Sequence, residues 1–243
     1  MLPKAILFDL DDTLISAYNR PDLAWNTIAH EFADDLHPCV PADVAMAINL
    51  AADIFWADAE RHRIGRLQLI DARTTIITDA FASLAQAGHT LPGPHVTRRM
   101  AARYNSFREE QMHLFDDAHH VVDTFREKGV RLALITNGAA IPQRAKVTRF
   151  DLTHRFHHIQ IEGEHGFGKP EERAYRHALR ILGVDAAETW MVGDNLEWEV
   201  IAPQRLGIHA IWHDIAGEGL PANSPARPDR VIRSLIELLD GIS

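Results

Sequence analysis

Short apolar runs that alternate with amphipathic helical patterns are the feature that most constrains the fold of this chain. Helical patterns lie between the runs at 118–129 and 171–183, and each ends at a glycine. Strands that alternate with helices predict a parallel β-sheet covered by helices on both faces, an α/β architecture. The strand-like runs occupy residues 4–10, 130–136, 158–162, 189–193 and 208–213.

Polar residues close three of these runs. Asp9, Thr136 and Asp194 each stand at the carboxyl end of a predicted strand. In open parallel sheets, ligands bind in the crevice outside the carboxyl ends of the strands. The coincidence predicts a functional site at this edge of the sheet.

A helix-rich segment with no convincing strand separates the first run from the others. We expect it to be an α-helical insertion at 16–113, with the α/β core formed by 1–15 and 114–243. The segment 216–230, rich in Gly, Pro and Ala, is expected to be loose. Helical spacing within the insertion occurs at 21–36, 41–62, 67–88 and 94–112.

Composition excludes several classes of protein. The 243 residues carry a formal net charge of −9, which argues against binding to nucleic acid or to an anionic membrane. The single cysteine, Cys39, excludes an intrachain disulfide framework or a thiolate zinc site. There is no apolar run of membrane-spanning length and no signal-peptide pattern at the N-terminus, so we expect a cytoplasmic protein. Nothing in the sequence indicates an oligomeric state.

The sharpest motif is DLDDTL, from Asp9 to Leu14. If Asp9 closes the strand and the chain then turns, Asp11 can point toward the same cavity. Two carboxylates there suit a nucleophile, an acid/base and a hard cation such as Mg²⁺. The alternative is an ordinary turn or helix cap, since this composition also starts helices.

The stretch GEHGFGKP, Gly163 to Pro170, resembles a nucleotide-binding P-loop but lacks its last position. Pro170 has neither the hydroxyl that binds Mg²⁺ nor an N–H for phosphate. Glu171 and Glu172 follow, so the stretch is interpreted as a helix start with proline at the first position. Lys169 then stands just before a helix N-terminus, where it supplies a cation to screen carboxylates and phosphate together.

Together these motifs resemble the haloacid dehalogenase (HAD) superfamily of Mg²⁺-dependent phosphohydrolases, over nearly the whole chain. They occur in the family's order: DxDxT at 9–13, the hydrophobic-T at Thr136, K-P at 169–170 and GD at 193–194. The resemblance implies a three-layer Rossmannoid core with a parallel sheet. The helical insertion resembles the family's cap of the C1 type.

The resemblance also implies catalytic roles. Asp9 attacks phosphorus to form an aspartyl-phosphate, and Asp11 protonates the leaving alcohol and then activates water. Thr136, with the backbone at Asn137 and Gly138, binds the transferring phosphoryl group. Lys169 offsets the charge on that group and on Asp9.

The metal site implied by the resemblance is made of oxygen ligands. Mg²⁺ is expected on Asp9, on the main-chain carbonyl of Asp11 and on Asp194. The family often has a further Asp four or five residues after its GD pair, where this chain has Glu199. Glu199 is expected to reach Lys169 or a metal-bound water without binding the metal directly.

Other activities of the superfamily remain alternatives. Haloacid dehalogenases of this superfamily carry the pattern D-x-Y where this chain has D-x-D, so Asp11 favours phosphoryl transfer. These motifs do not distinguish a phosphatase from a phosphomutase. Phosphonoacetaldehyde hydrolysis needs a lysine in the cap, and the insertion contains none. A receiver-type signalling module is about half as long and places its acceptor Asp on an internal strand.

The substrate is expected to be a small phosphorylated metabolite whose identity the sequence does not give. Adjacent histidine pairs, at 119–120 and 157–158, point in different directions and are expected to be solvated or packing residues. Polar or aromatic candidates for substrate contact in the insertion, most of them expected to face solvent or to pack helices, are Tyr18, Arg20, Trp25, Trp56, Arg63, Arg66 and Arg73.

Overall fold

The computed structural model describes residues 2–17 and 21–242, without the side chains of residues 21 and 22. The chain forms two compact units. Met1–Ser16 and His113–Ser243 make up the first, hereafter the core unit, and Ala17–Met112 make up the second, the helical unit. Among the described residues, no helix is both long and apolar enough to cross a bilayer.

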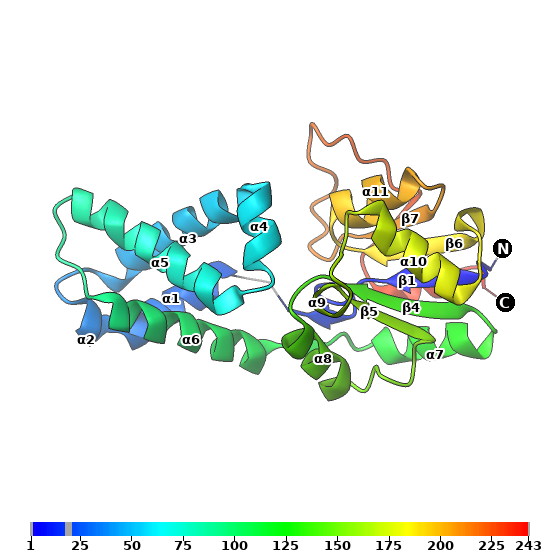
Figure 1. Ribbon diagram of the computed structural model, residues 1–243, viewed down its shortest axis with the longest axis horizontal. Coiled ribbons are helices and arrows are strands. Elements are labelled where there is room, and N and C mark those ends of the chain that lie inside the picture. The colour runs from blue at the N-terminus through cyan, green and yellow to red at the C-terminus, as the bar shows by residue number, and fades with distance from the viewer. Residues whose placement is uncertain (1, 18–20, 243) are drawn as a thin grey trace. The chain divides into compact units, whose positions relative to one another are not determined.

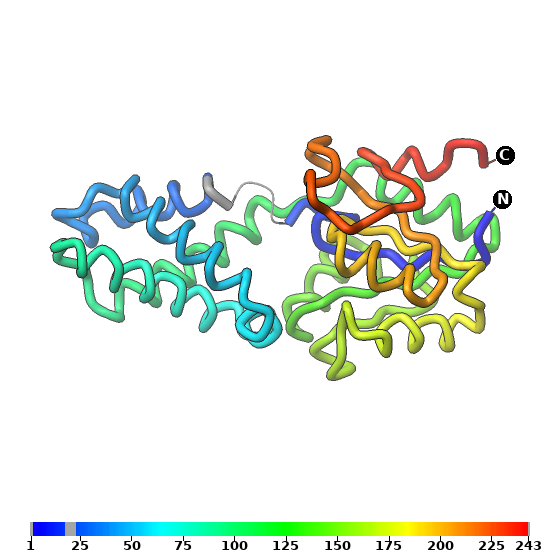
Figure 2. The backbone as a smooth tube through the Cα atoms, turned by 90° about the horizontal axis from the view of Figure 1, so that it is seen from above, coloured from blue at the N-terminus to red at the C-terminus, as the bar shows by residue number. Residues whose placement is uncertain are grey.

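A six-stranded parallel sheet, counted over the described residues, organises the core unit (Figure 1). Its order is β5-β4-β1-β6-β7-β8, so the first strand of the chain lies between β4 and β6. Figure 2 shows β1, in dark blue, running through the middle of the unit. This confirms the predicted Rossmannoid α/β fold. The strands are β1 (Ala5–Phe8), β4 (Arg131–Thr136), β5 (His158–Ile161), β6 (Thr189–Gly193), β7 (His209–His213) and β8 (Arg230–Ile232).

Helices cover both faces of this sheet because successive residues of its central strands are apolar, so that both faces are buried. Ala5 and Leu7 of β1 pack with α10 on one face, and Figure 1 shows α10 and α7 on opposite sides. Gly183, with φ of +63°, ends α10 as the sequence predicted. The helices of the core unit are α7 (Ala118–Glu127), α8 (Ala140–Arg149), α9 (Glu162–His165), α10 (Glu172–Leu182) and α11 (Ala202–Gln204), with short turns η1 (Ala186–Glu188), η2 (Leu196–Ile201) and η3 (Leu235–Leu239).

The helical unit has its own apolar core. The ring of Trp25 stacks on Tyr104 with centroids 3.8 Å apart, and both side chains are buried. Two predicted helices, 21–36 and 41–62, are each broken in two. The second break occurs at Asp58, whose Oδ1 accepts the Arg61 N–H at 2.8 Å and starts a new helix. The helices are α1 (Pro21–Glu31), α2 (Ala33–Leu36), α3 (Pro41–Ala57), α4 (Ala59–Gly65), α5 (Leu69–Gln86) and α6 (Pro94–Gln111).

A two-stranded antiparallel pair stands where the chain leaves and re-enters the core unit. In it β2 (Ile15–Ser16) pairs with β3 (His113–Leu114), strands that the sequence did not predict. Strand β8 was also missed, because it begins at the last residue of the segment expected to be loose. Both are too short for a periodic pattern to reveal them.

Candidate active site

Asp9 lies at the carboxyl end of the central strand. Its N–H continues the sheet by donating to the carbonyl oxygen of Val192 at 3.0 Å, which fixes the direction of the side chain. Oδ1 lies 2.5 Å from Nζ of Lys169, and Oδ2 accepts the Thr13 hydroxyl at 3.1 Å. Burial raises the pKa of the Asp9 carboxyl, and the Lys169 ammonium opposes that shift.

The chain reverses immediately after Asp9. The carbonyl oxygen of Leu10 accepts the N–H groups of Leu14 and Ile15 at 3.0 and 3.1 Å. Asp12 takes a φ of +56°, a left-handed conformation that aspartate tolerates better than most residues. This tight turn places Asp11 beside the strand end, as the sequence predicted, instead of starting a helix.

The Asp11 carboxylate is held by two side chains of α8. Oδ1 lies 2.7 Å from Lys146 Nζ, and Oδ2 accepts from Gln143 Nε2 at 2.8 Å. Gln143 also donates to Thr136 Oγ1 at 2.5 Å, which joins the ends of β1 and β4. Asp9 and Asp11, two residues apart, therefore have separate sets of partners.

Asn137 and Gly138, whose backbone was predicted to bind phosphate, also have protein partners. The Asn137 side chain bonds twice to the Lys169 main chain: Nδ2 donates to the carbonyl oxygen at 2.7 Å, and Oδ1 accepts the N–H at 2.8 Å. The Gly138 N–H donates to Glu162 Oε2 at 3.0 Å. A phosphate oxygen that binds there has to share or displace the bond to Glu162, whose carboxylate the sequence analysis did not single out.

Lys169 is completely buried between two carboxylates. Its Nζ lies 2.5 Å from Asp9 Oδ1 and 2.7 Å from Glu199 Oε1. Burial favours the neutral amine, but the charges of Asp9 and Glu199 raise the pKa of Lys169 above its usual value. The lysine is therefore a permanent cation at the strand ends.

The helix after Lys169 starts later than predicted. Its first residue is Glu172, with Glu171 at the N-cap, so Pro170 is not the first helical residue. The Lys169–Pro170 peptide is cis. The two hydrogen bonds from Asn137 hold the Lys169 main chain; this pair of bonds, here called the Asn137 clasp, positions the lysine more directly than the helix terminus does.

Glu199 bridges Lys169 and the loop after β6. Its Oε2 accepts the Asn195 N–H at 2.7 Å, and burial raises its pKa to about 7. A Cβ on Gly193 would lie 2.0 Å from Glu199 Cγ, so only glycine permits this approach. Glu199 lies in the π-helical turn η2, a rare local geometry often found near functional sites.

Asp194 adds a further acid to this end of the sheet. Burial, followed by the negative charges of Glu199, Asp9 and Asp12, raises its pKa well above the usual range. Carboxylates that crowd each other in this way are stabilised by a bound cation. The oxygen donors of Asp9, of Asp194 and of the main chain at Asp11, in the turn after Asp9, fit a hard divalent cation such as Mg²⁺.

Of the candidates for substrate contact, Tyr18 and Arg20 lie outside the described residues. Trp25 is buried in the helical unit. Arg73 is also buried, with its guanidinium 4.7 Å from the Tyr104 ring centroid. Arg63 pairs with Glu60 on the surface, and Trp56 is partly buried against the helical core.

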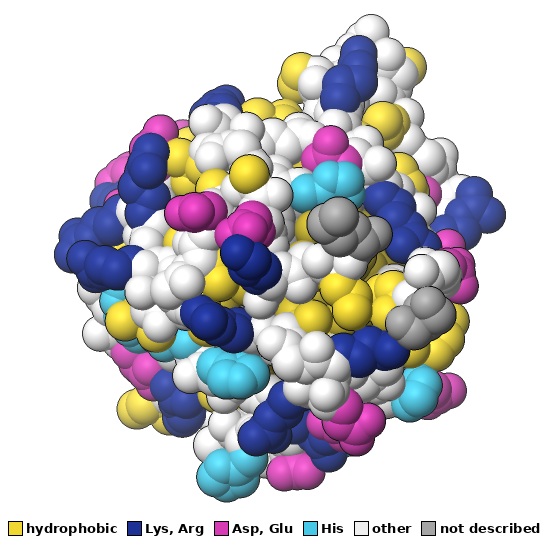
Figure 3. All heavy atoms as spheres, turned by 90° about the vertical axis from the view of Figure 1, so that its right-hand side faces the viewer, with side chains coloured by type: hydrophobic (Ala, Val, Ile, Leu, Met, Phe, Trp, Pro, Cys, Tyr) yellow, Lys and Arg dark blue, Asp and Glu magenta, His cyan; other side chains and the backbone are white. Residues whose placement is uncertain are grey.

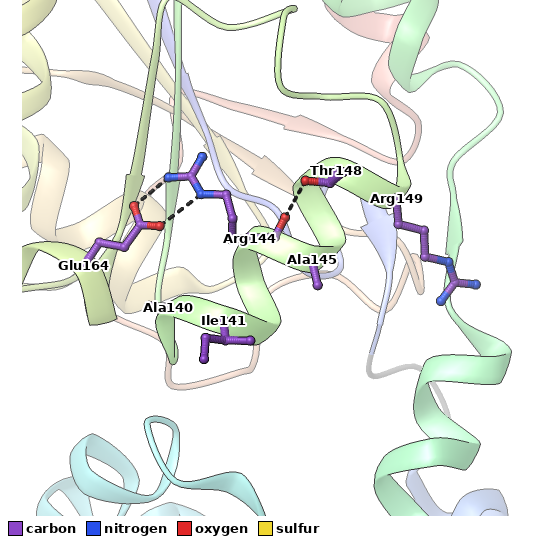
Figure 4. A pocket seen from close by; sticks show the side chains of 7 residues that line it. All are labelled: Ala140, Ile141, Arg144, Ala145, Thr148, Arg149 and Glu164. Carbon is purple, nitrogen blue, oxygen red and sulfur yellow. Dashed lines mark hydrogen bonds and ion pairs between the residues drawn. The ribbon is translucent and has the colours of Figure 1, made fainter.

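An open pocket of 590 Å³ lies on the other face of α8 (Figure 4). Arg144 and Glu164 form a two-point ion pair at its wall, and the remainder of the lining is mostly small or apolar. None of the predicted site residues lines this pocket. Figure 3 shows acidic and basic side chains interspersed on one face of the molecule, among the residues drawn in colour, so the net charge is not gathered there.

Comparison with known sequences assigns the family. The model of haloacid dehalogenase-like hydrolases matches residues 3–207. A phosphoserine phosphatase of Thermus thermophilus is 31% identical, over 97% of this chain and 97% of its own. The chain belongs to the haloacid dehalogenase-like hydrolases and is an enzyme of that family.

Solved structures share the fold. The HAD-hydrolase YfnB from Bacillus subtilis, bound to magnesium, matches with a TM-score of 0.68 at 21% identity, over 98% of each chain. A 2-haloacid dehalogenase from Pseudomonas syringae pv. Tomato DC3000 matches with a TM-score of 0.60 at 23% identity, over 98% of this chain and 96% of that one. At these identities the similarity establishes the fold and does not distinguish phosphate ester hydrolysis from dehalogenation.

Proposed function

We propose that this protein is a Mg²⁺-dependent phosphatase that hydrolyses a small phosphorylated metabolite through an aspartyl-phosphate on Asp9. The observation that carries the proposal is the separate environment of two carboxylates. Asp9 is paired with Lys169 and Thr13, whereas Asp11 is held by Lys146 and Gln143. Paired acids with different environments are typical of a nucleophile and an acid/base.

Asp9 is suited to attack phosphorus. Its anchorage by the sheet and by Lys169 leaves it one preferred orientation, and the ammonium favours the charged carboxylate against the effect of burial. When phosphate arrives, Lys169 remains a fixed positive charge beside the new negative charge. The proposed attack forms an O–P bond at Asp9 and expels the substrate alcohol.

Asp11 is suited to move the proton. In this role its carboxyl group donates a proton to the departing oxygen and later withdraws one from the water that cleaves the aspartyl-phosphate. Lys146 and Gln143 act as positioning residues that aim this group. Phosphate binding is assigned to Thr136 and to main-chain N–H groups at 137–138.

The proposed metal ligands are Asp9, Asp194 and the main-chain carbonyl of Asp11. The crowding of acids around Asp194 supports this assignment. When bound, Mg²⁺ neutralises phosphate charge and aligns the phosphoryl group with Asp9. Lys169 would add a second positive charge beside Asp9, at 2.5 Å from its Oδ1.

The helical unit is proposed to act as the cap. The proposal rests on its insertion at the β2–β3 pair, directly after the DxDxT turn. A lid hinged there excludes water during attack and admits it afterwards. We also propose that the protein is cytoplasmic, as the sequence led us to expect.

A metal-dependent assay with matched variants tests the function. Wild-type protein and Asp9→Asn are each assayed for release of an aryl alcohol from an aryl phosphate, with Mg²⁺ and with a chelator. We expect turnover only in the wild type with metal. Metal-independent halide release from a 2-chloroacid would instead establish the dehalogenase alternative, and Mg²⁺-dependent turnover by Asp9→Asn would contradict the assigned nucleophile.

A further inference from the structure

Three histidines from different elements meet beside the edge strand of the sheet. His158 lies in β5, His165 in α9 and His177 in α10, and ring nitrogens of all three lie within 4.8 Å of one another. The ring centroids are 5.2 to 6.0 Å apart. The three residues are not neighbours in the sequence, so no adjacent pair predicts the cluster; His157, the neighbour of His158, points elsewhere and accepts the N–H of Leu132.

Two buried ring nitrogens of this half-buried cluster lack a hydrogen-bond partner in the described part of the chain. Nε2 of His158 and Nδ1 of His177 are buried without a hydrogen-bond partner among the described residues. His165 uses Nδ1 on the carbonyl oxygen of Ile161 at 3.1 Å, which leaves Nε2 to bind a ligand. A metal-bound histidine usually donates its other ring N–H to a group such as a backbone carbonyl, as His165 Nδ1 can do here.

The surroundings favour neutral imidazoles over charged ones. Burial lowers the pKa of His158 and of His177, and the nearby Arg173 and Arg180 lower that of His177 further. Phe167 closes one side of the cluster, with its ring 5.5 Å from that of His177. Nearby arginines disfavour a hard cation held by charge alone, whereas neutral nitrogen ligands suit zinc, cobalt or nickel.

We propose that His158, His165 and His177 form a second metal site, which binds one borderline transition-metal ion such as Zn²⁺ through three ring nitrogens. Zn–N bonds of about 2.0–2.1 Å place tetrahedral nitrogens about 3.4 Å apart, so the rings close inward by about 1 Å. The fourth position takes water or a small anion. This site is separate from the carboxylate site proposed for Mg²⁺.

The position of the cluster gives the metal a structural effect. His165 precedes the loop that carries Lys169, and His177 follows it in α10. An ion bound to both, and to His158 of the sheet, fixes the two ends of that loop to the core. Metal binding is therefore expected to raise the melting temperature of the whole core unit.

Cobalt spectroscopy tests the proposal on the full, tag-free protein with excess Mg²⁺ present to fill oxygen sites. We expect one Co²⁺ per chain with intense visible absorption, displaced by one equivalent of Zn²⁺. His165→Gln and His177→Gln should each weaken Co²⁺ binding at least about 100-fold, because loss of a mere supporting residue already costs about 10- to 100-fold. Circular dichroism without metal confirms that both variants fold.

Two control variants separate this site from other causes. His120→Gln removes an exposed histidine of α7, and Asp194→Asn alters the proposed Mg²⁺ site; both should keep the cobalt spectrum. The proposal is overturned if wild-type protein shows no such spectrum, if the spectrum survives both cluster variants, or if Asp194→Asn abolishes it. None of these results bears on the phosphatase assay.

Discussion

Lys146 Nζ lies 2.7 Å from Asp11 Oδ1, and both side chains are mostly buried. Lys146 comes from α8, a helix that follows β4, whereas Asp11 follows β1. Gln143, one helical turn earlier on the same face, holds the other carboxylate oxygen. Helix α8, which follows Thr136, Asn137 and Gly138, thus orients the carboxyl group of Asp11 that is proposed as the acid/base.

Removing the Lys146 charge should harm the proton-transfer step selectively. We expect Lys146→Met to lower kcat about 10-fold or more on an alkyl phosphate, whose leaving group needs protonation, and less on a nitrophenyl phosphate. Lys146→Arg should recover part of the loss. Lys128→Met, at an exposed lysine, is the control. Equal losses on both substrates would mean that Lys146 supports structure only.

Loss of the Asn137 clasp should misplace Lys169. Asn137→Ala removes two hydrogen bonds to the lysine main chain and is expected to lower the free energy of unfolding by about 1–3 kcal/mol. Activity should fall at least 10-fold, by analogy with other positioning losses. Urea unfolding and aryl phosphate hydrolysis measure the two effects. Asn223→Ala, at an exposed position, should change neither.

Gly193→Ala tests the close approach of Glu199. The new Cβ would fall 2.0 Å from Glu199 Cγ, so the buried side chain has to move away from Lys169. We expect the free energy of unfolding to fall by at least about 2 kcal/mol. Gly93→Ala has open space and negative φ, and should cost less than about 1 kcal/mol. A similar cost at both positions would contradict the packing argument.

The stability of the metal-free protein should depend on pH through Glu199. Its pKa is raised from 4.5 to about 7 on folding, so the folded protein holds this proton more tightly than the unfolded chain. The resulting stabilisation is present below about pH 4.5 and is lost as the pH rises through about 7. Relative to Glu199→Gln, the wild type should lose up to about 3 kcal/mol over that range, since one pKa unit is about 1.4 kcal/mol.

Thermal or urea unfolding at several pH values, in chelator, measures this difference. Comparison with the Gln variant cancels the titration of groups that do not interact with Glu199, such as the buried His213, whose lowered pKa acts in the opposite direction. A difference between the two proteins that does not change with pH would show that Glu199 keeps the same charge throughout.

The residues at the strand ends were predictable because they are local. Asp9, Thr136 and Asp194 each follow an apolar run, and parallel strands bring their carboxyl ends to one edge. The proximity of Lys169 to Asp9 was expected from the resemblance of the motifs to those of the family. The structure pairs Glu199 with the same lysine, which is one of the two partners expected for it.

The residues that the sequence did not reveal depend on tertiary register. Gln143 and Lys146 are ordinary helix residues until α8 packs beside the DxDxT turn, although their spacing of three does place them on one helix face. Glu162 likewise needs β4 and β5 to be aligned before it reaches the Gly138 N–H. The start of α10 was misplaced because proline is common at the first helical position, and here it precedes the helix.

Chemical trapping of the Asp9 intermediate tests the central claim most directly. Asp11→Asn should still form the aspartyl-phosphate from an aryl phosphate with a good leaving group, but should hydrolyse it slowly. Borohydride reduction of the quenched mixture, followed by peptide mass spectrometry, is predicted to convert residue 9 to homoserine only when Mg²⁺ and substrate are both present. A burst of aryl alcohol release from that variant with residue 9 unmodified would contradict the account.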